Sequence, residues 1–144
     1  MITSILKGKG ADIVSVAPSD PILAVARTLT QHRIGAALVR DAAGAIVGII
    51  SERDIVRGMA EQGQGTTQLA AERLMTRELV TVSPGSSVAE AMGLMTRRRI
   101  RHLPVMDETG SLLGLVSIGD LVKARIEEAE HEAAELKAYV VSAG

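Results

Sequence analysis

The sequence predicts a mixed α/β fold (α/β, with α+β character) built from two copies of one supersecondary unit, and three observations support this prediction. Residues 14–57 align with residues 80–123 at a constant offset of 66 without a gap. Each copy has the apolar pattern of a strand, a helix, two strands and a second helix. Apolar residues make up 47% of the 144 residues, which is enough to build a core. Two copies of one unit predict a pseudo-twofold arrangement with two equivalent clefts.

The repeat preserves turn and polar residues as well as apolar ones. Apolar residues alone would not keep glycines, serines and aspartates at equivalent positions, so chance explains the repeat poorly. The preserved pairs include Pro18 and Pro84, Asp41 and Asp107, Gly48 and Gly114, Ser51 and Ser117, and Asp54 and Asp120.

Each copy begins with a predicted strand and helix. In the first copy Ile13–Ala17 predicts a short strand, and Asp20 followed by Pro21 predicts an N-cap with proline at the first helical position. In the second copy Ser86 or Ser87 is the predicted cap, and Ser87 with Glu90 would form a capping box. The apolar residues at helical spacing are Ile22, Val25, Ala26 and Leu29 in the first copy and Val88, Ala91, Met92 and Met95 in the second.

A β-hairpin is predicted next in each copy, from strands that are apolar on both faces as buried strands are. The turns at 41–44 and 107–110 open with aspartate and close with glycine, a composition typical of short turns between strands. The flanking strands are predicted at Ala36–Val39 and Ala45–Ile50 in the first copy, and at Leu103–Met106 and Ser111–Val116 in the second.

The segment between the copies and the end of the chain differ from the repeat. Glu61–Thr67 predicts a loop and Leu69–Met75 a short linking helix. The last helix is predicted from Ser117 to about Val140. Its apolar residues alternate at spacings of four and three, as in a coiled-coil seam, so the helix either packs on its own module or faces a partner. These seam residues are Val122, Ile126, Ala129, Ala133, Leu136 and Val140.

Composition excludes several classes of function. The net charge of −1 offers no field to attract nucleic acid or membrane, and Tyr139 as the only aromatic residue leaves no platform for base stacking. Without cysteine there is no disulfide framework, thiol nucleophile or cysteine-bound zinc. Residues 1–16 lack the apolar core of a signal peptide, and no apolar run approaches membrane-spanning length. A cytoplasmic protein is therefore the expectation.

The polar motif Gly-x-x-Ser-x-x-Asp occurs once in each copy, where a buried strand ends and a helix begins. One interpretation is structural, because Ser-x-x-Asp is a helix-capping pattern. The other is ligand binding: the helix N-terminus favours an anion, and a hydroxyl and a carboxylate one turn apart can hold the vicinal diol of a ribose. Capping and binding are compatible. The two motifs are Gly48–Asp54 and Gly114–Asp120.

A basic cluster at Arg97–Arg101 lies before the hairpin of the second copy. Arginines near a helix C-terminus complement the helix dipole, which is the structural interpretation. Four arginines in five positions exceed that need, so a phosphate clamp is the functional interpretation. A nucleic-acid patch is disfavoured, because neither net charge nor aromatic content supports it.

The strand–helix–strand–strand–helix order, written twice with the Gly-x-x-Ser-x-x-Asp motif, resembles a cystathionine-β-synthase (CBS) domain pair, or Bateman module. Ile50–Asp54 and His102-Leu103-Pro104 carry the resemblance most specifically, and the chain looks most like stand-alone bacterial CBS-pair proteins. The resemblance implies a first motif at residues 8–60, a linker at 61–76, a second motif at 77–126 and a helical extension at 127–144. It also implies two clefts between the motifs that bind AMP, ADP, ATP or NAD as regulatory ligands.

Carried over to matching positions, the resemblance implies specific roles. The two motif aspartates would hold ribose hydroxyls, and the motif serines would contact ribose or phosphate. The first residues of the first strands would border the adenine ring, and the backbone before each hairpin would contact the adenine edge. Arginines would contact the phosphates. The implied residues are Ile13, Val14, Gly35, Ala36, Ala37, Ser51, Arg53 and Asp54, and then Leu79, Val80, Arg99, Arg101, His102, Leu103, Pro104, Ser117 and Asp120. Leu38 in place of proline and Gly119 in place of arginine predict that the two clefts are unequal.

Three classes of function are compared. The leading hypothesis is a nucleotide-binding sensor that is not an enzyme, needs no metal and modulates an unidentified effector protein. Catalysis is disfavoured because His32, His102 and His131 form no nucleophile–base–orienter pattern, and no cluster has metal-ligand spacing. The alternative is a ligand-free structural dimerisation module. A homodimer is expected in either case.

Overall fold

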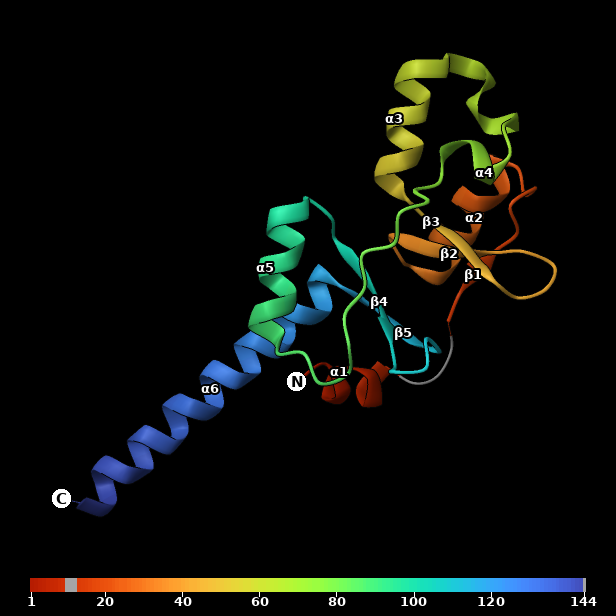
Figure 1. Cartoon of the computed structure of the whole chain (residues 1–144). Helices are drawn as coiled ribbons and strands as arrows, with labels where there is room; N and C mark the ends of the chain where they lie inside the picture. Colours follow the sequence, from red (N-terminus) through yellow and green to blue (C-terminus); the bar gives the residue numbers. More distant parts are fainter. Residues whose placement is uncertain (10–12, 144) are drawn as a thin grey trace. The chain divides into compact units, whose positions relative to one another are not determined.

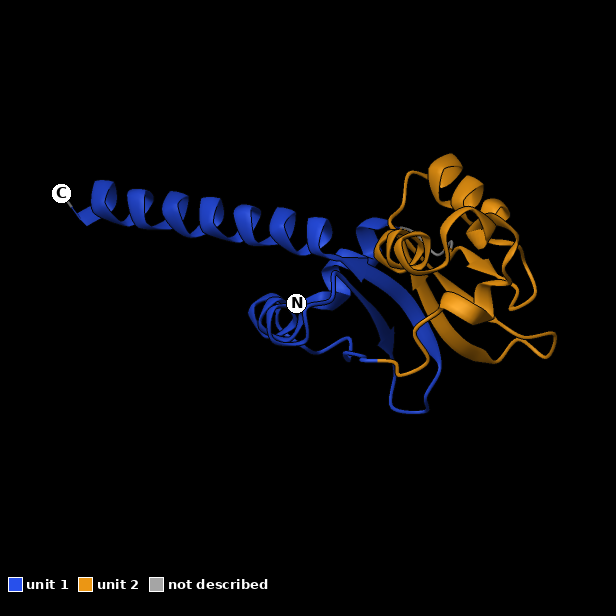
Figure 2. Ribbon diagram, turned by 90° about the horizontal axis from the view of Figure 1, so that it is seen from above, with its two compact units in different colours: residues 1–12, 80–144 blue, residues 13–79 orange. Residues whose placement is uncertain are grey.

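A computed structural model describes residues 1–9 and 13–143 of the chain. These residues form two compact units, of which one comprises residues 13–79 and the other residues 1–12 and 80–144 (Figure 2). We call them the 13–79 unit and the 80–144 unit. Both contain helices and strands, and the predicted mixed α/β fold with two repeats is confirmed (Figure 1).

The 13–79 unit is a three-stranded sheet covered by helices. Its strand order is β1-β2-β3, with β1 parallel and β3 antiparallel to β2. Apolar side chains of the sheet and helices, such as Val25, Leu29, Val39 and Ile50, form one core. The elements are β1 (Ser15–Val16), α2 (Ile22–His32), β2 (Ala36–Arg40), β3 (Ile46–Ser51), α3 (Glu52–Gln62), a 3₁₀ helix (Gly63–Gln68) and α4 (Ala71–Leu74).

The 80–144 unit has its own core around a two-stranded sheet. Its buried residues include Met95, Leu103, Val105 and Val116, which occupy the repeat positions of the other core, and Ile2 from the start of the chain. The elements are α1 (Ile2–Lys9), α5 (Val88–Arg98), β4 (His102–Met106), β5 (Leu112–Ser117) and α6 (Ile118–Ala143).

The hairpin of the repeat has the same backbone pairing in both units. The pairing of Ala36 with Ser51 between β2 and β3 recurs between His102 and Ser117 of β4 and β5, and both hairpins contain a register shift at the same place. Helices α2 and α5 both end at an arginine in the left-handed conformation, Arg33 with φ 54° and Arg99 with φ 55°. This conformation disfavours side chains with a Cβ atom, so its occurrence at both positions indicates a common constraint on how the helix joins the hairpin.

One substitution within the repeat explains why the two sheets differ in strand number. Leu38 donates its backbone N–H to the carbonyl of Val14 at 3.3 Å, which attaches β1 to β2. Pro104 occupies the equivalent position in β4 and has no N–H to donate. The strand expected at the start of the second copy is therefore not formed: the corresponding contact is a single bridge between Val82 and Val105, with the Val82 N–H donated to Pro104 O at 3.0 Å.

Two further local expectations are wrong. Asp20 does not cap α2: its carboxylate accepts the N–H of Ala17 at 2.9 Å, and Pro21 is the N-cap residue, without a side-chain cap. The expected loop at 61–67 is instead the end of α3 and a 3₁₀ helix, in which the Thr66 hydroxyl is buried and donates to Gly63 O at 2.7 Å. The capping box of Ser87 and Glu90 is confirmed.

Helix α1 in the 80–144 unit has the role that α4 has in the 13–79 unit. Ala71 and Glu72 donate their N–H groups to the carbonyls of Asp20 and Pro18, at 2.8 and 3.0 Å. Ile2 and Thr3 donate to Ser86 and Pro84, the repeat equivalents of Asp20 and Pro18, both at 3.1 Å. The segment that precedes each motif in the sequence thus packs on the other motif.

A motif glycine provides the space for each of these segments. A Cβ atom on Gly48 would lie 2.8 Å from the carbonyl oxygen of Thr76 and 2.7 Å from the sulfur of Met75. A Cβ atom on Gly114 would lie 2.5 Å from a methyl carbon of Leu6, which is part of α1. The first glycine of the Gly-x-x-Ser-x-x-Asp motif therefore has a packing role in both units.

Helix α6 continues beyond the rest of its unit (Figure 2). Leu121 is its only buried residue among those described, and all residues from 129 to 143 are exposed within this chain. The predicted seam is exposed as well, with Ile126 at 52% and Leu136 at 65% of full exposure.

We predict that Gly48→Ala destabilises the fold more than Gly114→Ala. The added methyl group in Gly48→Ala meets backbone at Thr76, which is bridged to Ile49, so the free energy of unfolding should fall by about 1–3 kcal/mol. Gly114→Ala meets only the flexible end of Leu6 and should cost less. Urea titrations measure both, with Gly85→Ala as the control because a Cβ there has no neighbour within 4 Å. Equal losses at the two motif glycines would contradict this account.

Candidate functional site

The strand-to-helix junction of each motif brings several predicted residues together. Ser51 ends β3 and caps α3, and it pairs with Ala36 at the start of β2. The N–H of Glu52, in the first turn of α3, is donated to Gly35 O at 2.9 Å. Residues 35–37, Ser51 and the first turn of α3 thus lie at one end of the hairpin.

The junction of the 80–144 unit repeats this arrangement. Ser117 ends β5 and pairs with His102, and the N–H of Ile118 is donated to Arg101 O at 2.8 Å. The Ser117 hydroxyl accepts the Asp120 N–H at 3.2 Å, while the Asp120 carboxylate accepts the Ser117 N–H at 2.8 Å. This reciprocal pair is the geometry of a capping box. The capping interpretation of the motif is thus correct in both units, since Ser51 and Asp54 form the same box.

The carboxylate of Asp54 is buried, with only 5% of its surface exposed. Its Oδ2 atom accepts the N–H and the hydroxyl of Ser51, at 2.9 and 3.1 Å. Its Oδ1 atom accepts the Thr76 hydroxyl at 3.3 Å and lies 3.5 Å from a guanidinium nitrogen of Arg57. Both oxygens of this carboxylate therefore have partners from the protein.

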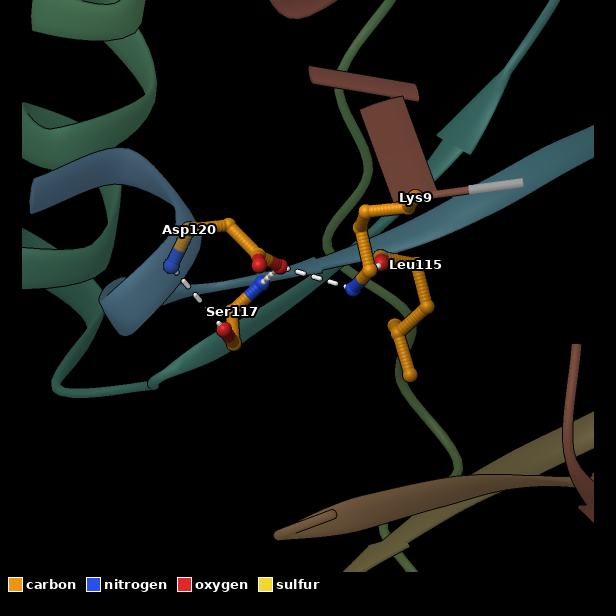
Figure 3. A network of polar contacts seen from close by, with 4 residues as sticks. All are labelled: Lys9, Leu115, Ser117 and Asp120. Carbon is orange, nitrogen blue, oxygen red and sulfur yellow. Dashed lines mark hydrogen bonds and ion pairs between the residues drawn. The ribbon is translucent and has the colours of Figure 1, made fainter. Parts of the chain in front are cut away.

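The carboxylate of Asp120 is more accessible and is paired with a lysine. Its side chain is 23% exposed, and Oδ2 lies 2.7 Å from the Nζ atom of Lys9 (Figure 3). The same ammonium group donates to Leu115 O at 2.8 Å. Lys9 is at the end of α1, so the N-terminal helix supplies a positive charge to the second motif.

These surroundings shift the pKa of Asp120 downward. Burial alone raises the pKa of this carboxyl, but the hydrogen bond from Lys9, the N–H of Ser117 and the positive charge of Lys9 together outweigh burial and hold it below the ordinary value of 3.8. Asp120 is consequently an anion at neutral pH, which makes it an acceptor for hydroxyl groups.

The other predicted residues of the 13–79 unit surround this junction at different depths. Ala36 and Ala37 are buried in β2. Val14 is half-buried and its carbonyl accepts the Leu38 N–H, which places it beside β2; Ile13 precedes it. Arg53 is exposed in the first turn of α3.

The predicted residues of the 80–144 unit are distributed similarly. Leu103 and Pro104 are buried in β4, His102 is half-buried, and Arg101 is exposed. Arg99 is exposed, and its left-handed backbone ends α5 by donating its N–H to Met95 O. Val80 packs against the core of the unit, whereas Leu79 is the last residue of the 13–79 unit.

The sequence interpretation missed three residues that contact the motif carboxylates: Lys9, Arg57 and Thr76. The repeat at an offset of 66 could not have found Lys9 or Thr76, because they lie on the segments that pack on the opposite motif. A weaker signal was available, since Ile2–Lys7 and Ala71–Thr76 place apolar residues at the same three positions, at an offset of 69.

The arrangement is suited to binding a small polar ligand. In each unit a helix N-terminus, a serine hydroxyl and a carboxylate meet at the end of a strand, a combination that can bind hydroxyl groups and anions. Within residues 1–9 and 13–143, no group of three or more histidine, aspartate or glutamate side chains is placed to hold a metal ion. No helix in this part of the chain is both long and apolar enough to cross a membrane.

Comparisons with known proteins give a consistent result. The family model described as CBS domain matches residues 9–61 and 71–127. A mitochondrial CBS domain-containing protein of Arabidopsis thaliana is 39% identical over 140 residues, which cover 93% of this chain and 68% of that protein.

Solved structures are similar as well. A CBS-domain containing protein from Agrobacterium tumefaciens has 43% identity and a TM-score of 0.83, over 86% of this chain and 92% of that chain. A CBS domain protein from Pyrobaculum aerophilum, complexed with AMP, has 29% identity and a TM-score of 0.71, over 83% of this chain and 88% of that chain.

We predict that Lys9→Met raises the pKa of Asp120 relative to the wild type, because it removes a hydrogen bond and a positive charge that lower it. A pH titration of the side-chain carboxyl ¹³C shift measures this pKa. The ionised Asp120 stabilises the fold above the unfolded-state pKa of about 3.9, and this stabilisation is lost as pH falls through the lower folded-state pKa. The wild type should therefore lose more stability than Lys9→Met on acidification through this range.

Lys7→Met is the matched control, because Lys7 is exposed on the same helix and the substitution changes net charge equally. A pKa of Asp120 that is the same in the wild type and in Lys9→Met would show that the ion pair does not form in solution.

Proposed function

The chain belongs to the CBS domain family, and from this premise we propose that it is a regulatory module that binds an adenosine-containing ligand and modulates a partner protein. The candidate ligands are AMP, ADP, ATP and NAD. The observation that carries the proposal is the ionised, partly exposed carboxylate of Asp120 beside the Ser117 hydroxyl at a helix start. The AMP complex of the Pyrobaculum relative supports the ligand class. The proposed role is ligand-dependent regulation, not catalysis.

In this proposal the motif carboxylates hold the ribose. A carboxylate accepts hydrogen bonds only, and two vicinal hydroxyl groups donate to it well. The hydrogen bonds that Asp120 receives from described residues fall on Oδ2, which leaves Oδ1 as an acceptor for a ribose hydroxyl. The Ser117 hydroxyl lies close enough to contact the same sugar or the adjoining phosphate.

The adenine and phosphate groups are assigned to the surrounding residues. The backbone at 35–37 and 101–103 would contact the edge of the adenine ring. The residues at 13–14 and 79–80 would contact the faces of the ring. Pro104 fixes the backbone in the second motif. The exposed arginines Arg53, Arg99 and Arg101 are assigned to phosphates, for which a guanidinium group is well suited.

We further propose that the two sites are unequal. Asp54 is 5% exposed and both of its oxygens have partners from the protein, whereas Asp120 is 23% exposed. Each carboxylate has one cationic neighbour, but Lys9 lies 2.7 Å from Asp120 and donates a hydrogen bond to it, whereas Arg57 lies 3.5 Å from Asp54. The 80–144 unit is therefore assigned the tighter site.

We predict that Asp120→Asn weakens binding of adenine nucleotides at least tenfold, which is about 1.4 kcal/mol. The amide oxygen of asparagine can still accept the Ser117 N–H, so the cap survives while the charged acceptor is lost; hydrogen bonds to charged groups are worth about 1.5–3 kcal/mol. Calorimetric titrations with AMP, ATP and NAD measure the effect, and the wild-type titration also reports whether the sites are unequal.

Glu90→Ala is the control, because it removes the carboxylate of a capping box in the same unit outside the proposed site. Asp120→Ala should weaken binding at least as much as Asp120→Asn, with circular dichroism to verify folding. Unchanged affinity in a folded Asp120 variant would refute the ribose role.

A homodimer is also proposed, with α6 at its interface. Six residues of α6 repeat at alternating spacings of four and three, and all of them except the two alanines are large and apolar. Within one chain Val122 is 41% exposed and Val140 61%, so this stripe is not buried by its own unit. A second copy of the helix offers a matching stripe, and burial of both is favourable.

We predict a dimer by light scattering at micromolar concentration and a monomer for the double variant Leu136→Glu/Val140→Glu, because charges in an apolar seam are costly. Val141→Glu is the matched control: Val141 is 75% exposed on the same helix but lies outside the seam. A chain that ends at Glu127 should also be monomeric. A monomeric wild type would eliminate the dimer, and a dimer that survives both changes would remove α6 from its interface.

A further inference from the structure

Lys9 in the 80–144 unit contacts the same two groups that Thr76 contacts in the 13–79 unit. Thr76 donates its N–H to Ile49 O at 2.8 Å and its hydroxyl to Asp54 Oδ1 at 3.3 Å. Lys9 donates its ammonium group to the carbonyl of Leu115, the repeat equivalent of Ile49, at 2.8 Å and to Asp120 at 2.7 Å (Figure 3). One flexible side chain has thus replaced a backbone contact and a hydroxyl contact.

The replacement follows from the different length of the two helices. Helix α4 ends at Leu74, the backbone of Met75 is extended, and Thr76 forms a bridge with Ile49. Helix α1 continues to Lys9, so the backbone position equivalent to Thr76, which is Lys7, is still helical. A long side chain from the next turn supplies the missing donor.

The two contacts differ in how easily they can be broken. Releasing Thr76 requires separating a backbone bridge with hydrogen bonds in both directions, Ile49 N–H to Thr76 O at 2.9 Å and Thr76 N–H to Ile49 O at 2.8 Å. Releasing Lys9 requires only rotation of a side chain that is 40% exposed. An ammonium group on a four-carbon chain gains rotamer freedom and hydration when it leaves.

Lys9 also contacts the group that the proposed ligand needs. An oxygen atom of a carboxylate has two lone pairs, and Oδ2 of Asp120 already accepts the Ser117 N–H and the Lys9 ammonium. A ribose diol that engages both oxygens of Asp120 must therefore take the position of the Lys9 ammonium.

We propose that Lys9 is a latch on the 80–144 site: it pairs with Asp120 in the absence of ligand, and an adenosine-containing ligand displaces it and frees the end of α1. This inference rests on the proposed function and adds the regulation of one of its two sites. In the 13–79 site a bridged threonine takes the place of the lysine, and the cation beside Asp54, Arg57, lies on the same helix α3, so its displacement would free no separate segment. Ligand occupancy of the 80–144 unit would thereby be converted into a change at the N-terminal helix.

The test measures adenosine binding by NMR on the wild type, Lys9→Met and Lys7→Met. Adenosine has no phosphate, so loss of general electrostatic attraction does not obscure the result. The amides of Ser117 and Asp120 report the 80–144 site, and those of Ser51 and Asp54 report the other site as an internal control. We expect Lys9→Met to bind about two- to fivefold more tightly at the 80–144 site, as the loss of one partly exposed ion pair predicts. Lys7→Met should bind like the wild type.

Amide hydrogen exchange gives a second test. If Lys9 had only a structural role, adenosine would not change the exchange rates at the end of α1. Adenosine should accelerate exchange of the amides at Leu6–Lys9 in the wild type, and it should have no such effect in Lys9→Met, in which the latch is already absent. Slower exchange of these amides on binding would overturn the latch.

The remaining outcomes separate the latch from the proposed function. Equal or weaker adenosine binding by Lys9→Met, with normal binding by the wild type, overturns the latch and leaves the proposed function standing. If Lys9→Met binds AMP more weakly than the wild type does but binds adenosine equally well, Lys9 is a phosphate contact instead, and this outcome would also overturn the latch. Binding of neither adenosine nor AMP by any of the three proteins would overturn both proposals.

Discussion

Each unit depends on a carboxylate in the first turn of the helix that follows its hairpin, bound by the backbone N–H of the serine that ends the preceding strand. This contact joins β3 to α3 and β5 to α6, and it satisfies one of the free donors of the helix start. The residue after each serine donates its N–H to the hairpin backbone, at Gly35 in one unit and Arg101 in the other, so the helix start is attached to the hairpin. The fold and the candidate site therefore share a single interaction, and capping and binding are two consequences of it.

The segment that precedes each motif in the sequence packs on the other motif, and this makes the two sites chemically different. The linker reaches the first carboxylate through Thr76 and the N-terminal helix reaches the second through Lys9, while the motif glycine, serine and aspartate are the same in both copies. Part of the asymmetry thus arises outside the repeat. The repeat adds to it, because Arg57 pairs with Asp54 and Gly119 stands where the first copy has Arg53.

Much of the fold could be predicted because its signals are local. Apolar periodicity, the Asp–Gly turns and the capping box of Ser87 and Glu90 depend on residues close in the sequence, and the hairpin strands lie within one residue of their predicted ranges. The wrong predictions concern the cap of α2 and the segment 61–67, where a side chain makes a contact other than the one usual for its sequence pattern. The Asp20 carboxylate accepts the N–H of Ala17 and does not cap α2. The Thr66 hydroxyl donates to Gly63 O within a 3₁₀ helix, in a segment whose glycines indicated a loop.

The sequence by itself determined the two-copy α/β fold, the positions of the motif serines and aspartates and their capping geometry, because each of these depends on spacing within one copy. Only the tertiary structure decided which segment covers which motif. That packing in turn decided that Lys9 pairs with Asp120 and Thr76 with Asp54. These partners are far apart in the sequence, and they meet because packing at Gly48 and Gly114 places each segment on the opposite motif. No periodicity within a copy encodes that choice.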